Sequence, residues 1–195
     1  IGDEIMCVLP SADAGCLAAT DMHHKIMALP PVSQVKRSVR IGFHFGPVIE
    51  ENNDVFGDTV NVAARMAGLA KGMQILVREG TVSKDLAALA ELITTERAPF
   101  LAFCTDDRNP LDIAEEGHVD YLIRAAIRKG VKPLNAYRAA TWSAARHFGL
   151  VDRGLVAPGQ RADLVLLEDL ESCAIRSVIC RGAPVTPDRF KARPG

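Results

Sequence analysis

The feature that most constrains the fold is a continuous apolar run at residues 100–104, which leads directly into a polar loop at residues 105–110. A run of this length is typical of a strand that is buried on both faces of a parallel sheet. In α/β folds, the loops at the carboxyl ends of such strands carry the chemistry. The sequence therefore predicts an α/β fold with a candidate site in the loop 105–110.

Apolar spacing and turn residues predict the elements on either side of this run. Before it we expect a strand at 5–9, a helix at 12–29 that ends at a Pro-Pro pair, a hairpin over 39–49, a helix from residue 59 and a strand at 73–77. After it we expect helices at 119–127 and 133–149, then β-rich runs at 162–167 and 175–180 that form a terminal sheet. Proline ends the first helix because it cannot continue the hydrogen-bond ladder.

Composition excludes several classes of protein. The 195 residues carry 23 Lys and Arg against 24 Asp and Glu, a formal net charge of -1, so we expect neither a nucleic-acid partner nor charge-driven membrane binding. No apolar stretch reaches the ~18 to 20 residues of a membrane-spanning helix. Five cysteines without a C-x-x-C pair predict reduced thiols. We expect a cytoplasmic chain that is cut from a longer one, since it begins with Ile1 directly before a strand.

A first group of candidate site residues lies in the stretch D-x-x-G-D-T-V-N-x-A-x-R at residues 54–65. Asn61 and Arg65 are four residues apart on the expected helix, so their amide and guanidinium groups share one face. Together with residues 1–4 and 39–46, this stretch resembles the catalytic domain of class III adenylate/guanylate cyclases. The resemblance covers residues 1–77.

The cyclase resemblance implies that a ribose hydroxyl attacks the α-phosphate of ATP at a two-metal site in a homodimer. Asp3 is then a ligand for Mg²⁺ or Mn²⁺, which prefer carboxylate oxygen, and Asp54 contacts the purine. Asn61 positions the ribose, and Arg65 stabilises the transition state. The alternative is structural: Asp3 is a turn residue, and Asn61 and Arg65 are surface residues of a helix.

A second resemblance includes the loop after the apolar run. Residues 103–110, 116–118 and 149–164 resemble adenine deaminases of the amidohydrolase superfamily, and the resemblance extends over residues 73–185. It implies the last two strands of a (β/α)₈ barrel, the helices that follow them and the strands of a small terminal sheet. Adenine is then the small-molecule substrate, and Mn, Fe or Zn is the divalent metal.

Within this second resemblance, Asp106 matches the aspartate that both touches the metal and shuttles the proton. Asp107 is the less favoured bearer of that role, and a solvated turn is the alternative for both residues without the flanking match. His118 either lines the site or caps the helix that starts at Val119.

We interpret the two resemblances as separate parts: a partial nucleotide cyclase at 1–77 with a ferredoxin-like fold, barrel strands and helices at 78–150, and β-sandwich strands at 151–195. Both families use further metal ligands that lie upstream of this sequence. Our first hypothesis is therefore a fusion of two truncated purine enzymes that lacks both activities. Two alternatives stay open, namely a functional adenylate cyclase homodimer with upstream residues and a noncatalytic purine-nucleotide-binding or dimerisation module.

Overall fold

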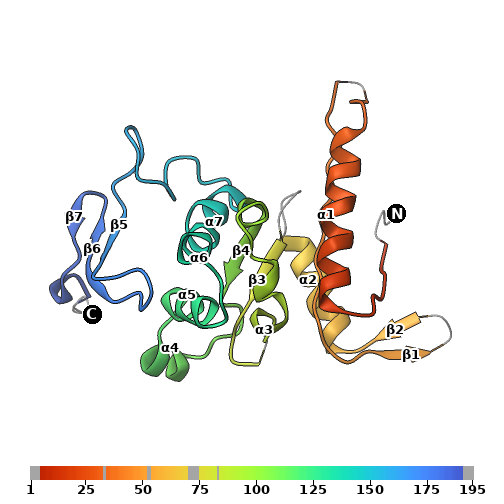
Figure 1. The fold of residues 1–195 in the computed structure, drawn as a ribbon, viewed down its shortest axis with the longest axis horizontal. Coiled ribbons are helices and arrows are strands. Elements are labelled where there is room, and N and C mark those ends of the chain that lie inside the picture. Colours follow the sequence, from red (N-terminus) through yellow and green to blue (C-terminus); the bar gives the residue numbers. More distant parts are fainter. Residues whose placement is uncertain (1–4, 33, 52–53, 70–74, 83, 191–195) are drawn as a thin grey trace, which may run out of the picture.

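The structure is a computed structural model that describes residues 5–32, 34–51, 54–69, 75–82 and 84–190. Its elements, in chain order, are α1 (Ala12–Ala28), β1 (Ile49–Glu51), β2 (Asp54–Phe56), α2 (Asp58–Leu69), β3 (Ile75–Arg78), α3 (Leu86–Leu89), η1 (Ala90–Leu92), η2 (Ala98–Phe100), β4 (Leu101–Cys104), α4 (Pro110–Glu116), α5 (Val119–Arg128), α6 (Pro133–Ala140), α7 (Trp142–His147), β5 (Leu164–Leu167), β6 (Ile175–Cys180), β7 (Ala183–Pro184) and η3 (Pro187–Phe190). The hairpin β1-β2 and the sheet β5-β6-β7 lie at opposite ends of the molecule, with β3 and β4 between them (Figure 1).

The parallel pair β3-β4 forms the centre of the core. In its register Ile75 pairs with Leu101, and Arg78 pairs with Cys104. Helices cover the pair, since α5, α6 and α7 contact β4, α3 contacts β3, and α1 contacts α3. Both strands are therefore buried along their apolar residues. The prediction of a buried parallel strand before the polar loop is confirmed.

Two helices show how local sequence sets the helix ends. The first, α1, begins after Ser11, whose Oγ accepts a hydrogen bond from the N–H of Ala14 at 3.2 Å, and it ends before the Pro-Pro pair. The other, α5, buries Leu122 and Ala126 on one face. It ends before Gly130, whose φ of 89° lies in the left-handed region that glycine adopts easily. The helices predicted at 12–29 and 119–127 are confirmed.

The amino-terminal part differs from the prediction. The described residues 5–9 and 39–48 form no strand ladder, and the hairpin lies later in the chain, where β1 pairs with β2 in antiparallel register. A two-stranded hairpin offers little apolar surface for further strands, and Ile5 of the expected first strand is 91% exposed. The ferredoxin-like fragment predicted for residues 1–77 is thus not present in the part of that stretch that the structure describes.

The helix predicted at 133–149 is divided into α6 and α7 at Thr141. The backbone of Thr141, with φ of -120° and ψ of -85°, is not helical. Its Oγ1 donates a hydrogen bond to the carbonyl of Tyr137 at 2.7 Å, and its N–H turns to the carbonyl of Arg138 at 3.3 Å. The hydroxyl therefore takes the acceptor that the helical N–H uses in an unbroken helix.

The carboxyl-terminal strands form an antiparallel sheet in which β6 pairs with both β5 and β7. This sheet confirms the β-rich runs predicted near 162–167 and 175–180. Among the described residues, no helix is long and apolar enough to span a membrane.

Candidate active site

The loops that follow β3 and β4 meet at the carboxyl edge of this sheet. The ladder extends one bond beyond the strands, because the N–H of Glu79 donates to the carbonyl of Cys104 at 3.0 Å. Asp106 lies two residues after Cys104 and has a φ of 41°, in the left-handed region that non-glycine residues rarely adopt. The fold thus brings Asp106 to the edge where the sequence predicts a site.

A buried arginine lies under Asp106. The side chain of Arg78 is 1% exposed, and its Nη1 donates to Oδ2 of Asp106 at 2.9 Å. Its Nε donates to Oδ2 of Asp85, also at 2.9 Å. The ring of His44 contacts both Arg78 and Asp85, with 2.9 Å between His44 Nδ1 and Asp85 Oδ1. One guanidinium therefore joins the loops that follow β3 and β4.

Side-chain hydrogen bonds join the same two loops at a second place. Thr81 Oγ1 donates to Oδ2 of Asp112 at 2.5 Å and accepts from the N–H of Asn109 at 2.8 Å. Oδ2 of Asp107 accepts from the N–H of Val82 at 3.1 Å. These contacts fix the position of Asp107 and of the start of α4 relative to the end of β3.

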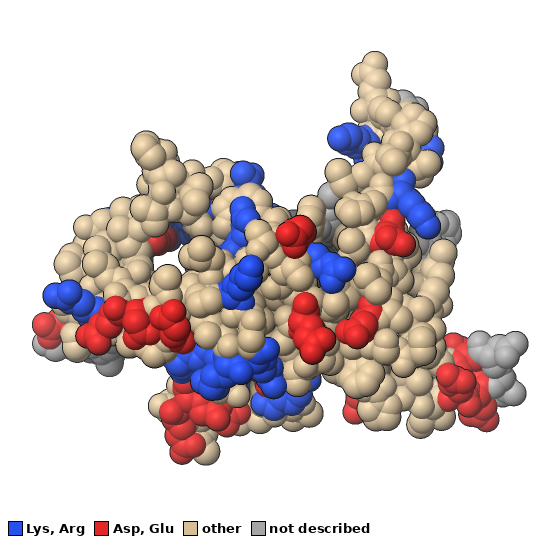
Figure 2. All heavy atoms as spheres, viewed as in Figure 1, with Lys and Arg blue, Asp and Glu red and all other residues tan. Residues whose placement is uncertain are grey.

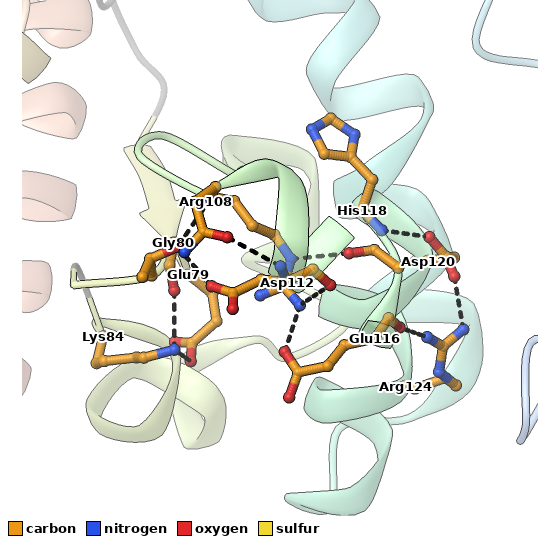
Figure 3. Close-up of polar contacts among 12 residues, drawn as sticks. Glu79, Gly80, Lys84, Arg108, Asp112, Glu116, His118, Asp120 and Arg124 are labelled. Carbon is orange, nitrogen blue, oxygen red and sulfur yellow. Dashed lines mark hydrogen bonds and ion pairs between the residues drawn. The ribbon is translucent and has the colours of Figure 1, made fainter. Parts of the chain in front are cut away.

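Glu79 supports the loop after β3 from within. Its Oε2 accepts from the N–H of Leu86 at 3.2 Å at the start of α3, and its Oε1 lies 3.5 Å from Nζ of Lys84. Lys84 also donates to the carbonyl of Gly80 at 2.8 Å, a contact drawn in Figure 3. The carboxylate of Glu79 thus stabilises the loop between β3 and α3.

Arg108 holds α4 in place through contacts with residues 112, 116 and 117. Its Nε donates to the carbonyl of Gly117 at 2.7 Å, its Nη2 donates to the carbonyl of Asp112 at 3.2 Å, and the same Nη2 pairs with Glu116 (Figure 3). The guanidinium also lies 4.0 Å from the centre of the Tyr121 ring, in cation–π contact. The planar group therefore closes α4 against the first turn of α5.

His118 occupies the N-cap position of α5, but its side chain makes no capping bond. Its backbone N–H donates to Oδ1 of Asp120 at 2.8 Å, while its Nε2 lies 3.0 Å from Oγ1 of Thr105 (Figure 3 shows His118 and Asp120). Burial raises the pKa of Asp120, but hydrogen bonds from Arg124 and from the His118 N–H outweigh this effect and hold the pKa below its usual range. The ring of His118 thus contacts the residue directly before Asp106.

The structure does not bring the first group of predicted residues to this site. Asp54 is exposed on the hairpin, where its Oδ1 accepts from the N–H of Val55 at 2.9 Å, and Asn61 is exposed on α2. Figure 2 shows acidic side chains at the end of the hairpin, which carries Glu50 and Glu51 beside Asp54. Arg65 lies in α2, but its side chain is outside the described part of the structure, as is the whole of Asp3.

Sequence reasoning missed the roles of Arg78 and Asp85. A signal was present, because a charged residue follows the apolar run 75–77 directly, at the end of a strand expected to be buried. A buried guanidinium must find carboxylate or carbonyl partners. The sequence offers several carboxylates nearby, and only the fold selects Asp85 and Asp106.

A cavity of about 890 Å³ lies elsewhere, between α6, α7 and the chain that leads to the terminal sheet. Its lining includes Lys132, Asn135, Trp142 and Leu155, and none of the predicted site residues. Asp106 and His118 therefore lie outside this cavity, beside the loop that follows β4.

Comparisons with known proteins show the family of the chain. The model of the amidohydrolase family matches residues 33–185, so the chain belongs to the amidohydrolase family. The chain is 62% identical over 136 residues to the adenine deaminase of Methylobacterium nodulans, and 62% identical over 125 residues to that of Brucella anthropi. These stretches cover 70% and 64% of this chain, and 24% and 22% of the relatives. The chain thus spans about a quarter of the length of the curated relatives that it matches.

A solved β-aspartyl dipeptidase from Fervidobacterium islandicum superposes with a TM-score of 0.48 at 24% identity. The superposition covers 64% of this chain and 34% of that one.

These findings correct the predicted fusion of two truncated purine enzymes. The family match begins at residue 33, well inside the stretch 1–77 that was assigned to a cyclase. The matches support the deaminase part, and none of them supports a cyclase part, a fusion or a homodimer. The cyclase roles of Asp3, Asp54, Asn61 and Arg65, with their Mg²⁺ or Mn²⁺ and ATP, therefore lose their basis.

Amidohydrolases generally use a divalent metal, and the donor groups of this chain decide whether its described residues fit one. Among the described residues, no group of three or more His, Cys, Asp or Glu could hold a metal ion. Oδ2 of Asp106 is already paired with the guanidinium of Arg78. A catalytic zinc centre takes three protein ligands, so the donor set of the described residues does not fit a metal centre.

Proposed function

We propose that this chain supplies the part of an adenine deaminase that holds the proton-transferring carboxylate. The supporting observation is that this chain is 60–63% identical to four adenine deaminases over 125–136 residues. The substrate is then a small purine, and the products are hypoxanthine and ammonia. We assign residues 78–150 to the last strands and helices of the barrel and residues 151–195 to the small terminal sheet.

The reaction needs a group that moves a proton between water and the purine. When water replaces the amino group at C6, the water oxygen loses both of its protons. One reaches the departing nitrogen, which leaves as ammonia, and the other ends on the ring as the N1–H of hypoxanthine. A positioned carboxylate can carry out both transfers and typically contributes about 10²- to 10⁴-fold. We assign this role to Asp106, which the fold holds at the carboxyl edge of the sheet. His118, through Thr105, is the neighbouring side chain that we expect to line the site.

A segment exchange tests this proposal. The aligned 136 residues of the Methylobacterium nodulans adenine deaminase are replaced by the matching residues of this chain, and ammonia release is measured with adenine, guanine and cytosine. We expect the exchange enzyme to deaminate adenine within about tenfold of its parent and to prefer adenine over the other two bases, because 62% of the exchanged residues are identical in the two proteins. An exchange enzyme that folds and binds metal as its parent does, but forms no hypoxanthine, contradicts the proposal.

A further inference from the structure

We propose that Arg78 is a positioning residue that holds the carboxylate of Asp106 in place by sharing one guanidinium between Asp85 and Asp106. This inference deepens the proposed function, and its catalytic meaning rests on that function. The anchoring itself is a statement about the geometry of the chain. Arg78 acts only through Asp106 and is not placed in contact with substrate.

The first step of the argument is the division of the guanidinium between its partners. Nε of Arg78 donates to Asp85 at 2.9 Å, and Nη1 donates to Asp106 at 2.9 Å. These two nitrogens lie on different edges of one rigid plane, so the plane cannot serve one carboxylate without setting the direction of the other. Lysine, a point charge on a flexible stem, lacks this geometry.

The second step concerns the base of the bridge. Asp85 is 4% exposed at its side chain, and its N–H donates to the carbonyl of Arg78 at 3.1 Å. Nδ1 of His44 contacts both Oδ1 of Asp85 and Nη2 of Arg78. Asp85 is therefore the fixed end of the bridge, whereas Asp106, with a side chain that is 16% exposed, is the end that opens to the site.

The third step is the backbone of Asp106. A non-glycine residue persists in the left-handed region only when its surroundings hold it there. The φ of Asp106 is 41°, and the bond to Arg78 is a contact that spans from β3 to this residue. Arg78 thus fixes both the conformation and the direction of the carboxylate to which we assign the proton transfer.

The test is nuclear magnetic resonance of the full 195-residue chain, labelled with ¹⁵N and ¹³C, at one neutral pH. We expect D106N to shift or broaden the Nη signals of Arg78, and D85N to shift its Nε signal. We also expect D85N to move the carboxyl ¹³C signal of Asp106, because both carboxylates accept hydrogen bonds from the guanidinium of Arg78. D107N is the matched control and should leave the Arg78 signals unchanged, because Oδ2 of Asp107 accepts from the N–H of Val82.

Unchanged Arg78 signals in D106N, or an unchanged Asp106 signal in D85N, would overturn the positioning role whatever the activity. Backbone amide spectra check that each variant folds, and the two aspartate variants keep the test decisive if R78K does not fold. In the exchange enzyme, R78K should lower kcat about 10- to 100-fold and change KM less than about threefold. If R78K lowers kcat/KM only by raising KM, with kcat unchanged, the positioning role is also overturned. An exchange enzyme without adenine turnover would overturn the proposed function alone.

Discussion

Gly80 and Asp107 lie so close that a Cβ on Gly80 would fall 1.7 Å from Oδ1 of Asp107 and 3.0 Å from the carbonyl oxygen of Thr105. The loops after β3 and β4 therefore pack without room for a side chain at residue 80. This packing is part of the same edge that holds Asp106.

Gly80→Ala should destabilise the chain by about 1–3 kcal/mol, the usual range for overpacking. Asp107 must turn away and lose its bond to the N–H of Val82, while the carbonyl of Thr105 cannot easily move. Chemical denaturation measures the change. Gly15→Ala in α1 is the control, because its Cβ would meet only ordinary contacts at 3.8 Å or more and alanine favours a helix. Equal effects at the two glycines would contradict the close packing.

Arg108→Lys should cost about 1–3 kcal/mol of unfolding free energy, because partly buried carbonyls lose their donors. Lysine cannot serve the carbonyls of Gly117 and Asp112 together, and it loses the flat contact with Tyr121. Arg128→Lys is the matched control on exposed surface and should change stability by less than about 0.5 kcal/mol. Thermal unfolding compares the two variants directly. If Arg108→Lys leaves the unfolding free energy unchanged, α4 is held in place by other contacts.

The free energy of unfolding should fall as the pH is lowered, because α1 carries a buried histidine, His23. Burial lowers the pKa of His23 below its ordinary value of 6.5. Between these two pKa values the unfolded chain binds a proton that the folded chain does not, so stability is full above pH 6.5 and is lost as the pH falls through the folded pKa. Denaturation at several pH values from neutral downward should show this loss. His23→Gln should reduce the slope and the exposed neighbour His24→Gln should keep it, and the opposite pattern would refute the assignment.

Cys104 should react slowly with alkylating reagents. Burial raises the pKa of its thiol, despite a hydrogen bond from the backbone of Asp106, and the thiolate is the reactive form. Cys7 is exposed and serves as the internal comparison. With iodoacetamide near pH 8, mass spectrometry of peptides should find Cys104 labelled at least about tenfold more slowly than Cys7. We expect Cys104 and Cys7 to be alkylated at equal rates only after denaturation. Equal rates in the folded chain would contradict the burial of β4.

The carboxyl-terminal part of the fold could be predicted because its signals are local. The apolar run before the loop 105–110 and the stripe that ends at Gly130 each mark an element through its own residues, and the Pro-Pro pair does the same for α1 in the first half of the chain. Thr141 shows the limit of such signals. Its hydroxyl competes for a helical carbonyl, and a polar residue in a helical pattern does not reveal which acceptor it takes.

The strand predicted at 5–9 and the hairpin predicted over 39–49 were wrong for a different reason. Strands become strands only when a partner pairs with them, and residues 5–9 have an apolar pattern but no partner in the described structure. For the site, sequence singled out Asp106 and His118 but not Arg78 and Asp85. Asp106 is 28 residues from Arg78 and comes near it through the parallel register of β3 and β4. Asp85 is seven residues from Arg78 and comes near it through the turn in which its N–H donates to the carbonyl of Arg78.

The most direct test of the account compares Asp106→Asn with Asp107→Asn in the exchange enzyme, with hypoxanthine formation as the readout. Asparagine has nearly the shape of aspartate but cannot accept and return the proton. We predict that Asp106→Asn lowers kcat about 10²- to 10⁴-fold and that Asp107→Asn changes it less than about tenfold, since asparagine can still accept from the N–H of Val82. Near-normal turnover in Asp106→Asn, or an equal loss in both variants, would contradict the assignment of the reaction to Asp106.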